Sequence, residues 1–346
     1  MAYTTIDKSS LHFNTKLYTG NGSTQNITGV GHQVDWTWIK YRTDTEGHGL
    51  FDRIRGALYR IQSNSDGVSS SQAGTVTAFG SDGFSLGSNA EVNANNGSYV
   101  SWNWKANGAG SSNSDGDITS TVSANTTSGF SIVKYTGNGS ASNIGHGLGS
   151  ALKAIIIKKT SGSADWLVGH NSLHPTLPWK YGINLNNTGA RHESGSYFAD
   201  TAPTSSVFRV EANDEVNTSG QTYIAYCFAE KTGFSKFGSY TGNANDDGSF
   251  VYTGFKPAFV LVKNTAISDN WSIFDSKRLG YNAYNYVLYA DITNVGSNGL
   301  PMDILSNGFK WRTSAAMVNG SGNNCIYMAF AEAPLVSSNN IPVTAR

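Results

Sequence analysis

Tyr135-Thr136-Gly137-Asn138 is a tetrapeptide that occurs three times in the chain, starting at Tyr18, Tyr135 and Tyr240. An apolar run that ends in a lysine follows each copy, and these lysines are Lys40, Lys158 and Lys263. The tyrosine and the lysine are 22, 23 and 23 residues apart, so the spacing is kept. Because an internal repeat decides which architectures are open to a chain, this repeat is the starting point for the fold.

The three copies also end alike. In each copy a phenylalanine opens a polar stretch, a Val-Asn step follows, and an aromatic segment closes the copy. The phenylalanines are Phe84, Phe208 and Phe309, the asparagines are Asn93, Asn217 and Asn319, and the closing segments are 99–104, 223–228 and 325–330. A unit of about 100 residues is the size of an ordinary domain, and it is longer than the unit of a solenoid. We therefore predict three tandem copies of one module.

The repeat also sets the domain boundaries. We predict β module 1 at 1–106, a Gly/Ser/Asn-rich linker at 107–128, β module 2 at 129–230, β module 3 at 231–335 and a C-terminal tail at 336–346. Each module is long enough to hold its own core. A flexible linker would let module 1 swivel relative to the other two modules.

Within a module the segments have the character of strands. Residues 130–135 and 250–255 are rich in β-branched and aromatic residues and are bounded by Gly and Asn, which favours short strands. One stretch is ambiguous, since apolar residues in 50–61 fall at helical spacing. The matching stretch of module 3 contains Gly and Asn, which make a helix unfavourable, so two strands and a turn are the preferred interpretation. The predicted fold is all-β, with three tandem β-sandwich or jelly-roll-like modules.

Composition and charge exclude several classes of protein. Lys+Arg and Asp+Glu number 24 each and no basic run stands out, so we expect no nucleic-acid partner. No apolar stretch approaches the ~20 residues of a membrane-spanning helix, so we expect no membrane insertion. The N-terminus has no secretory signal, and the expected place of synthesis is a host cytoplasm. Cys227 and Cys325 lie in apolar runs and are expected to be buried free thiols.

Residues that could carry chemistry do not recur at matching positions. The seven histidines do not align across the copies, and no nucleophile, zinc or phosphate-loop motif is present. His170 aligns with Asp52 and Asp275, and we expect these three residues to cap strand ends. The adjacent carboxylates Asp246 and Asp247 lie in a Gly/Asn turn, which favours a turn over a catalytic pair. The sequence predicts no enzyme, no catalytic residue, no metal and no cofactor.

Two groups of side chains are candidates for contact with a partner. The repeated lysines Lys40, Lys158 and Lys263 are expected to be exposed charges that protect a strand edge, and the alternative is a repeated role at a module or subunit contact. Most tryptophans occupy aligned strand positions and are assigned to the core. Trp179 and Trp311 are less well explained by the core, and they are the candidates for contact with a glycan or protein partner.

The repeated motifs resemble a family of modules found in structural proteins of marine bacteriophages, including cyanophage-type viruses. The resemblance rests on Tyr-Thr-Gly-Asn-Gly, Phe-Val-Tyr-Thr-Gly-Phe-Lys-Pro, Trp-Ser-Ile-Phe-Asp-Ser-Lys-Arg and Tyr-Ile-Ala-Tyr-Cys-Phe-Ala-Glu, and it covers nearly all of residues 1–335. It implies a tail-fibre-like or other virion protein and no catalytic residue.

Three functions follow as hypotheses. The preferred one is a phage virion surface protein, a tail-fibre, spike or receptor-binding component that contacts a host surface glycan through several weak sites. The alternative is a capsid decoration protein, and a polysaccharide-cleaving tail enzyme is a distant third. The expected partners are other virion proteins, further copies of the chain in a homo-oligomer and a host surface glycan.

Overall fold

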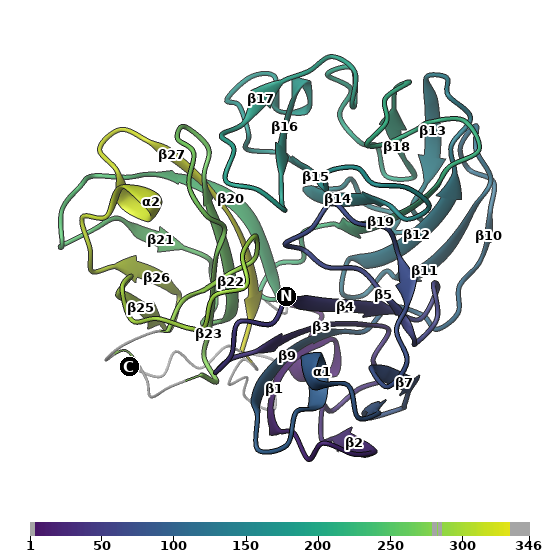
Figure 1. Ribbon diagram of the computed structural model, residues 1–346. Helices are drawn as coiled ribbons and strands as arrows, with labels where there is room; N and C mark the ends of the chain where they lie inside the picture. Colours follow the sequence, from purple (N-terminus) through teal and green to yellow (C-terminus); the bar gives the residue numbers. More distant parts are fainter. Residues whose placement is uncertain (1–3, 279–281, 283–285, 333–346) are drawn as a thin grey trace.

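The computed structural model describes residues 4–278, 282 and 286–332, and the described chain is nearly all β. Its three modules surround a common centre (Figure 1). Each module packs a main antiparallel sheet against a smaller outer sheet, which in module 2 is the two-stranded sheet β13-β18. This confirms the predicted all-β, sandwich-like fold. The predicted tail at 336–346 lies outside the described residues.

Module 1 has the main sheet β1-β9-β3-β4 and the outer sheet β2-β8-β7. Its elements are η1 (Ser9–Leu11), β1 (Phe13–Thr19), β2 (Gln25–Thr28), β3 (Trp36–Tyr41), β4 (His48–Asp52), β5 (Tyr59–Arg60), β6 (Ser70–Ser71), β7 (Val76–Phe79), β8 (Gly83–Leu86), α1 (Ala90–Asn93) and β9 (Ser98–Trp104). β4, a turn and β5 occupy residues 50–61, so the interpretation of that stretch as two strands is confirmed. Its helical spacing was misleading because both faces of β4 are buried.

Module 2 repeats this arrangement and extends it. Its elements are β12 (Phe130–Thr136), β13 (Ser142–Gly145), β14 (Ala154–Lys159), β15 (Leu167–His170), η2 (Pro178–Lys180), β16 (Tyr181–Asn184), β17 (His192–Glu193), β18 (Val207–Val210) and β19 (Thr222–Phe228). Two further strands, β10 (Ser111–Asn113) and β11 (Ser120–Asn125), join its main sheet in the order β10-β11-β12-β19-β14-β15-β16-β17.

The prediction of a linker at 107–128 is therefore wrong. β11 pairs with β12 along five residues and hides the edge of the main sheet. The Gly, Ser and Asn of this segment serve turns and an edge hairpin, and such residues are also typical of linkers.

Module 3 has the main sheet β20-β27-β22-β23-β24 and the outer sheet β21-β26-β25. Its elements are β20 (Ser235–Thr241), β21 (Phe250–Tyr252), β22 (Pro257–Asn264), β23 (Ser272–Asp275), β24 (Leu288–Tyr289), β25 (Met302–Leu305), β26 (Gly308–Trp311), α2 (Ala316–Asn319) and β27 (Asn324–Ala331). The first, last and middle strands of all three modules pair in the same order, as three copies of one module require. No helix in the described chain has the length and apolar character needed to cross a membrane.

The repeated tetrapeptide joins the end of a module's first strand to the turn that precedes its last strand, and module 2 shows the contacts. The hydroxyl of Tyr135 donates to the carbonyl oxygen of Val216 at 2.7 Å. A Cβ at Gly137 would lie 2.4 Å from a backbone oxygen, so the close approach there requires glycine. The buried Asn217 accepts from the backbone N–H of Asn138 at 2.9 Å and donates to its side chain at 3.2 Å. The matching pairs are Asn93 with Asn21 and Asn319 with Asn243. The motif is therefore structural.

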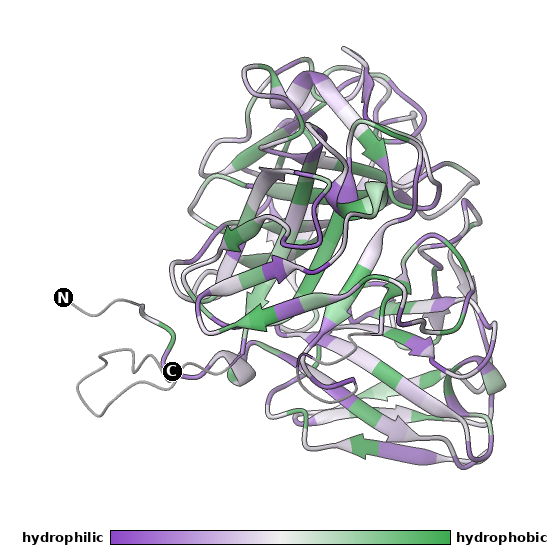
Figure 2. Cartoon of the chain, turned by 90° about the vertical axis from the view of Figure 1, so that its left-hand side faces the viewer, coloured by the Kyte–Doolittle hydropathy of each residue, from purple (hydrophilic) through white to green (hydrophobic). Residues whose placement is uncertain are grey.

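A shared core fills the centre of the molecule. Side chains of one strand point alternately to its two faces, and apolar and polar bands alternate along the strands in Figure 2. One face of each main sheet covers the core of its own module, and the other face packs against the other two modules. The central face of the last strand carries Trp102 and Trp104, Tyr226 and Phe228, and Met328 and Phe330.

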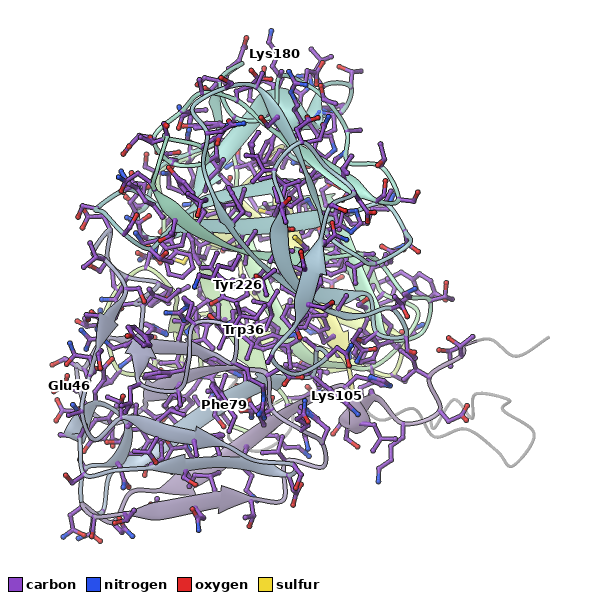
Figure 3. The ribbon with its side chains drawn as sticks, turned by 90° about the vertical axis from the view of Figure 1, so that its right-hand side faces the viewer. Trp36, Glu46, Phe79, Lys105, Lys180 and Tyr226 are labelled. Atoms are coloured by element: carbon purple, nitrogen blue, oxygen red, sulfur yellow. The ribbon has the colours of Figure 1, made fainter. Side chains whose placement is uncertain are left out.

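Each module does hold its own core, as expected, but the shared central core was not predicted. Trp36 of module 1 stacks on Tyr226 of module 2 with ring centres 4.2 Å apart, and both lie in the middle of the molecule in Figure 3. Phe13 of module 1 stacks on Phe330 of module 3 at 5.1 Å. The predicted swivel of module 1 is wrong, because moving that module would expose these rings to water.

Candidate functional site

The aligned polar residues Asp52, His170 and Asp275 stand at the ends of β4, β15 and β23, and all three are buried. Each accepts a hydrogen bond from a backbone N–H two or three residues further along the chain. This confirms that they cap strand ends.

The same three residues also join the modules in a closed ring. Tyr226 of module 2 donates its hydroxyl to Asp52 at 2.8 Å. His170 donates from Nε2 to the carbonyl oxygen of Tyr327 in module 3 at 3.2 Å, because its Nδ1 already accepts from a backbone N–H. Trp102 of module 1 donates from Nε1 to Asp275 at 3.0 Å. One position in each module therefore contacts the next module, and the third contact returns to the first module.

A second ring of hydrogen bonds starts at the other end of these strands. Trp166 donates from Nε1 to the carbonyl oxygen of Gln62 at 3.0 Å, and Trp271 donates to that of Asn184 at 2.8 Å. The matching residue of module 1 is His48, which donates to the carbonyl oxygen of Tyr289 at 2.8 Å. Burial lowers the pKa of His48 to about 3 and that of His170 to about 4, so both imidazole side chains are neutral at pH 7.

The repeated lysines are buried, so the prediction that they are exposed strand-edge charges is wrong. Lys40, Lys158 and Lys263 are fully buried, and burial lowers the pKa of each ammonium to about 8. Lys158 donates to the carbonyl oxygen of Asp66 in module 1 at 2.9 Å, and Lys263 donates to that of Thr188 in module 2 at 2.9 Å. These two lysines take the alternative role at a module contact. Lys40 donates to the carbonyl oxygen at the end of its own strand and to two carbonyl oxygens of the loop that follows.

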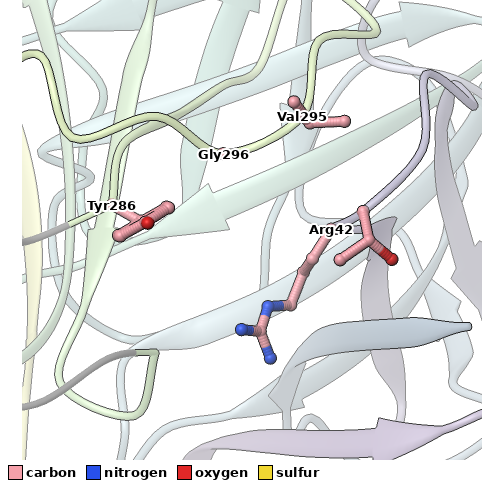
Figure 4. Close-up of a pocket in the computed structure, with 5 residues that line it drawn as sticks. Arg42, Tyr286, Val295 and Gly296 are labelled. Carbon is pink, nitrogen blue, oxygen red and sulfur yellow. The ribbon is translucent and has the colours of Figure 1, made fainter.

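Module 1 and module 3 meet at the interface that closes the ring, and the backbone contact is longest there. Gly296 donates its N–H to the carbonyl oxygen of Arg42 at 3.4 Å, whereas the equivalent bonds at the other two interfaces are 3.0 and 3.1 Å long. A cavity of about 340 Å³ opens beside this contact (Figure 4). Its lining includes Arg42, Thr43, Tyr286, Val295 and Gly296. Sequence reasoning missed this place because it is built from segments about 250 residues apart.

Arg42 is the charged group of this cavity. Its partial burial lowers the pKa of the guanidinium, Arg278 lowers it further, and Asp275 opposes the change. Arg42 stands where modules 2 and 3 carry Thr160 and Thr265, so the other copies have no charge at this position. A guanidinium that lines a cavity is suited to a planar oxyanion such as a carboxylate.

Trp179 and Trp311, the two tryptophans expected to contact a partner, are both buried. Trp179 is 4% exposed and packs edge-on against Phe198, and Trp311 is fully buried beside Phe274. The prediction of surface contact is therefore wrong for both residues. The exposed aromatic side chains include instead Phe250 and Tyr252, which are 46% and 60% exposed. Phe250-Val251-Tyr252 is apolar at all three positions, so the sequence has no apolar/polar alternation there that could have shown which side chains are exposed.

Other candidate groups have structural roles. Cys227 and Cys325 are buried free thiols, as expected. Asp246 accepts from the backbone N–H of Ser314 at 2.8 Å, and Asp247 forms ion pairs on the surface. Among the described residues, no three or more His, Cys, Asp or Glu side chains gather as a metal site would require.

Comparison with known proteins gives a family and no curated relative. No curated protein matches the chain. A family model described as a domain of unknown function, DUF7483, matches residues 8–334, which is nearly the whole chain. The chain therefore belongs to the DUF7483 family.

Proposed function

We propose that the chain is a surface protein of a bacteriophage virion, a tail-fibre, spike or receptor-binding component. The observation that carries the proposal is the closed ring of three like modules in one chain. Three copies of one fold, joined by equivalent contacts, imitate a trimer whose subunits cannot separate. The resemblance of the repeated motifs to structural proteins of marine phages is the reason for proposing the virion as the location.

The scaffold suits display of several surfaces on one rigid body. The central core holds the modules in one orientation, while the outer sheets face away from it. Each outer sheet can then change its exposed side chains without disturbing the core. Several weak contacts on one rigid body gain affinity together when they reach the same host surface.

Capsid decoration is the second candidate, and the shape of the chain favours it over a long fibre. The helices of the described chain are three or four residues long, and the three modules pack around one centre instead of forming a shaft. A compact body of this kind can sit on a capsid or at the tip of a short spike.

Purified virions test the proposal. Quantitative gel densitometry and immunogold labelling with antiserum against the recombinant chain would give its copy number and position. On the order of hundreds of copies over the head indicate decoration, and a few tens or fewer on the tail indicate a fibre or spike. Absence of the chain from the purified particles would overturn the proposal.

Adsorption kinetics separate receptor binding from decoration. Host cells preincubated with an excess of the recombinant chain should adsorb the phage more slowly if the chain occupies the receptor. An unchanged adsorption rate in the presence of saturating chain contradicts the receptor-binding role.

A further inference from the structure

Phe250 and Tyr252 form an exposed aromatic pair on the outer sheet of module 3. They lie on β21, two residues apart, so both side chains leave the same face of the strand. Val251 between them points into the module core and is 5% exposed. Phe250 and Tyr252 are 46% and 60% exposed, so this strand carries two large apolar rings toward solvent.

The fold does not require aromatic residues at these two positions. The corresponding strand of module 1, β2, carries Asn26 and Thr28 there and pairs with β8 in the same register. The corresponding strand of module 2, β13, carries Asn143 and Gly145. Two copies thus build the same strand with small or polar residues, whereas the strand of module 3 exposes two aromatic rings to water at a cost in hydration free energy.

The Phe250 ring lies beside Gly308. This glycine lies on β26 opposite Tyr252 and diagonal to Phe250. A Cβ at Gly308 would lie 2.1 Å from the carbonyl oxygen of Val251, so the backbone approach requires glycine there, as it does at Gly83 of module 1. The same Cβ would lie 3.2 Å from the ring atom Cε2 of Phe250, so the ring reaches across the sheet toward this bare backbone. The edge strand therefore presents the ring over a surface without a competing side chain.

Charged side chains border the pair and neutralise one another. Lys310, the cross-strand neighbour of Phe250, forms an ion pair with Asp247 at 2.7 Å. Arg312 joins Asp247 at 3.2 Å and Asp303 at 2.5 Å. Two acids and two bases leave no net charge, and Asp247 and Arg312 are well exposed, with 74% and 44% of their side chains accessible.

We propose that this face, formed by Phe250, Tyr252, Lys310, Asp247 and Arg312, binds a neutral saccharide. The rings would stack on the apolar C–H faces of sugar residues, and the paired charges would exchange hydrogen bonds with the hydroxyl groups. The absence of net charge on the face disfavours an acidic glycan, which would leave Asp247 and Asp303 opposed to like charge. The inference rests on the proposed function and names the host ligand of the virion protein.

The size of the face favours a saccharide over a protein partner. Two fully exposed aromatic side chains could bury on the order of 400 Å², and because Phe250 and Tyr252 are 46% and 60% exposed, about half of that area is available. A stable protein interface needs roughly 800 Å² per partner and a larger apolar centre. Two or three sugar units fit the smaller area.

Affinity electrophoresis of the full-length chain tests the inference. The gels contain dextran, mannan or the neutral polysaccharide extracted from the host envelope, with alginate as the acidic probe. The wild-type chain should be retarded by the neutral host polysaccharide. The double variant Phe250→Asn/Tyr252→Thr takes its residues from module 1, so it should keep the thermal transition and lose at least tenfold in affinity. Tyr59→Thr, at another exposed aromatic residue of the chain, is the matched control and should bind like the wild type.

Several results overturn the inference. These are no retardation by the host polysaccharide, retardation by alginate alone, equal binding by the double variant, and a dimer in size-exclusion chromatography that the double variant abolishes. The last result would make the face a contact between copies. If virions contain the chain but the saccharide result is negative, only this inference fails. Saccharide binding by a chain that is absent from virions contradicts the proposed function instead.

Discussion

Replacing Trp36 with alanine tests whether the three modules share one core. The indole is 1% exposed and lies between Trp104 of its own module and Tyr226 and Phe130 of module 2, with ring centres 4.2 to 5.7 Å away. Trp→Ala substitutions in cores cost about 3–5 kcal/mol, so we expect a loss of about 4 kcal/mol in the free energy of unfolding. At about 2.1 cal/mol/K of unfolding entropy per residue, a chain of 346 residues should lose roughly 5 °C in Tm.

The assay must show which strands lose stability. Calorimetry gives the change in Tm, and hydrogen exchange followed by mass spectrometry gives protection in β19 of module 2. Trp36→Ala should raise exchange in β19, because the rings that cover that strand lose their partner. Phe84→Ala, in the separate core of module 1, is the matched control and should leave β19 protected at the same Tm loss. Unchanged protection in β19, or a Tm loss under about 1 °C, would refute the shared core.

Three further predictions concern buried groups. Burial lowers the pKa of His170 to about 4 in the folded state, from its ordinary 6.5, so the stability that the neutral imidazole contributes is present above pH 6.5 and is lost as the pH falls through 4. His170→Gln should remove about 3 kcal/mol of the fall in the free energy of unfolding between pH 7 and pH 4, measured by denaturant titrations at the two pH values. Asp291 stands where modules 1 and 2 carry asparagine, and burial raises its pKa to about 6. Asp291→Asn should therefore stabilise the protein by up to about 3 kcal/mol at pH 7 and by nothing at pH 3.5. An equal gain in stability at both pH values would contradict this prediction. Lys158→Met should cost about 3 kcal/mol, since three carbonyl oxygens lose their donor, whereas the exposed Lys134→Met should change the unfolding midpoint little.

The repeat made the module fold and its internal contacts predictable. Each copy of the repeat contains its own strand order, its closing aromatic strand and its cap at Asp52, His170 or Asp275. The sequence therefore shows the same local pattern three times, which made these features predictable.

The burial of Trp179 could not be predicted, since it lies in the short helix η2 and packs on Phe198, a residue outside the repeated landmarks. The burial of Trp311 was missed although its ring packs on Tyr240, Phe274 and Phe309 of the repeated segments, because those contacts join strands far apart along the module.

The amino-acid sequence by itself determined the module, because its period, alternation and turn residues act over short distances along the chain. Only the tertiary structure decided which face of each main sheet meets the other modules. A strand such as β19 is apolar on both faces, and nothing local distinguishes the face that covers its own module from the one that packs at the centre. The buried lysines show the same limit, because the carbonyl oxygens that hold Lys158 and Lys263 come partly from a neighbouring module.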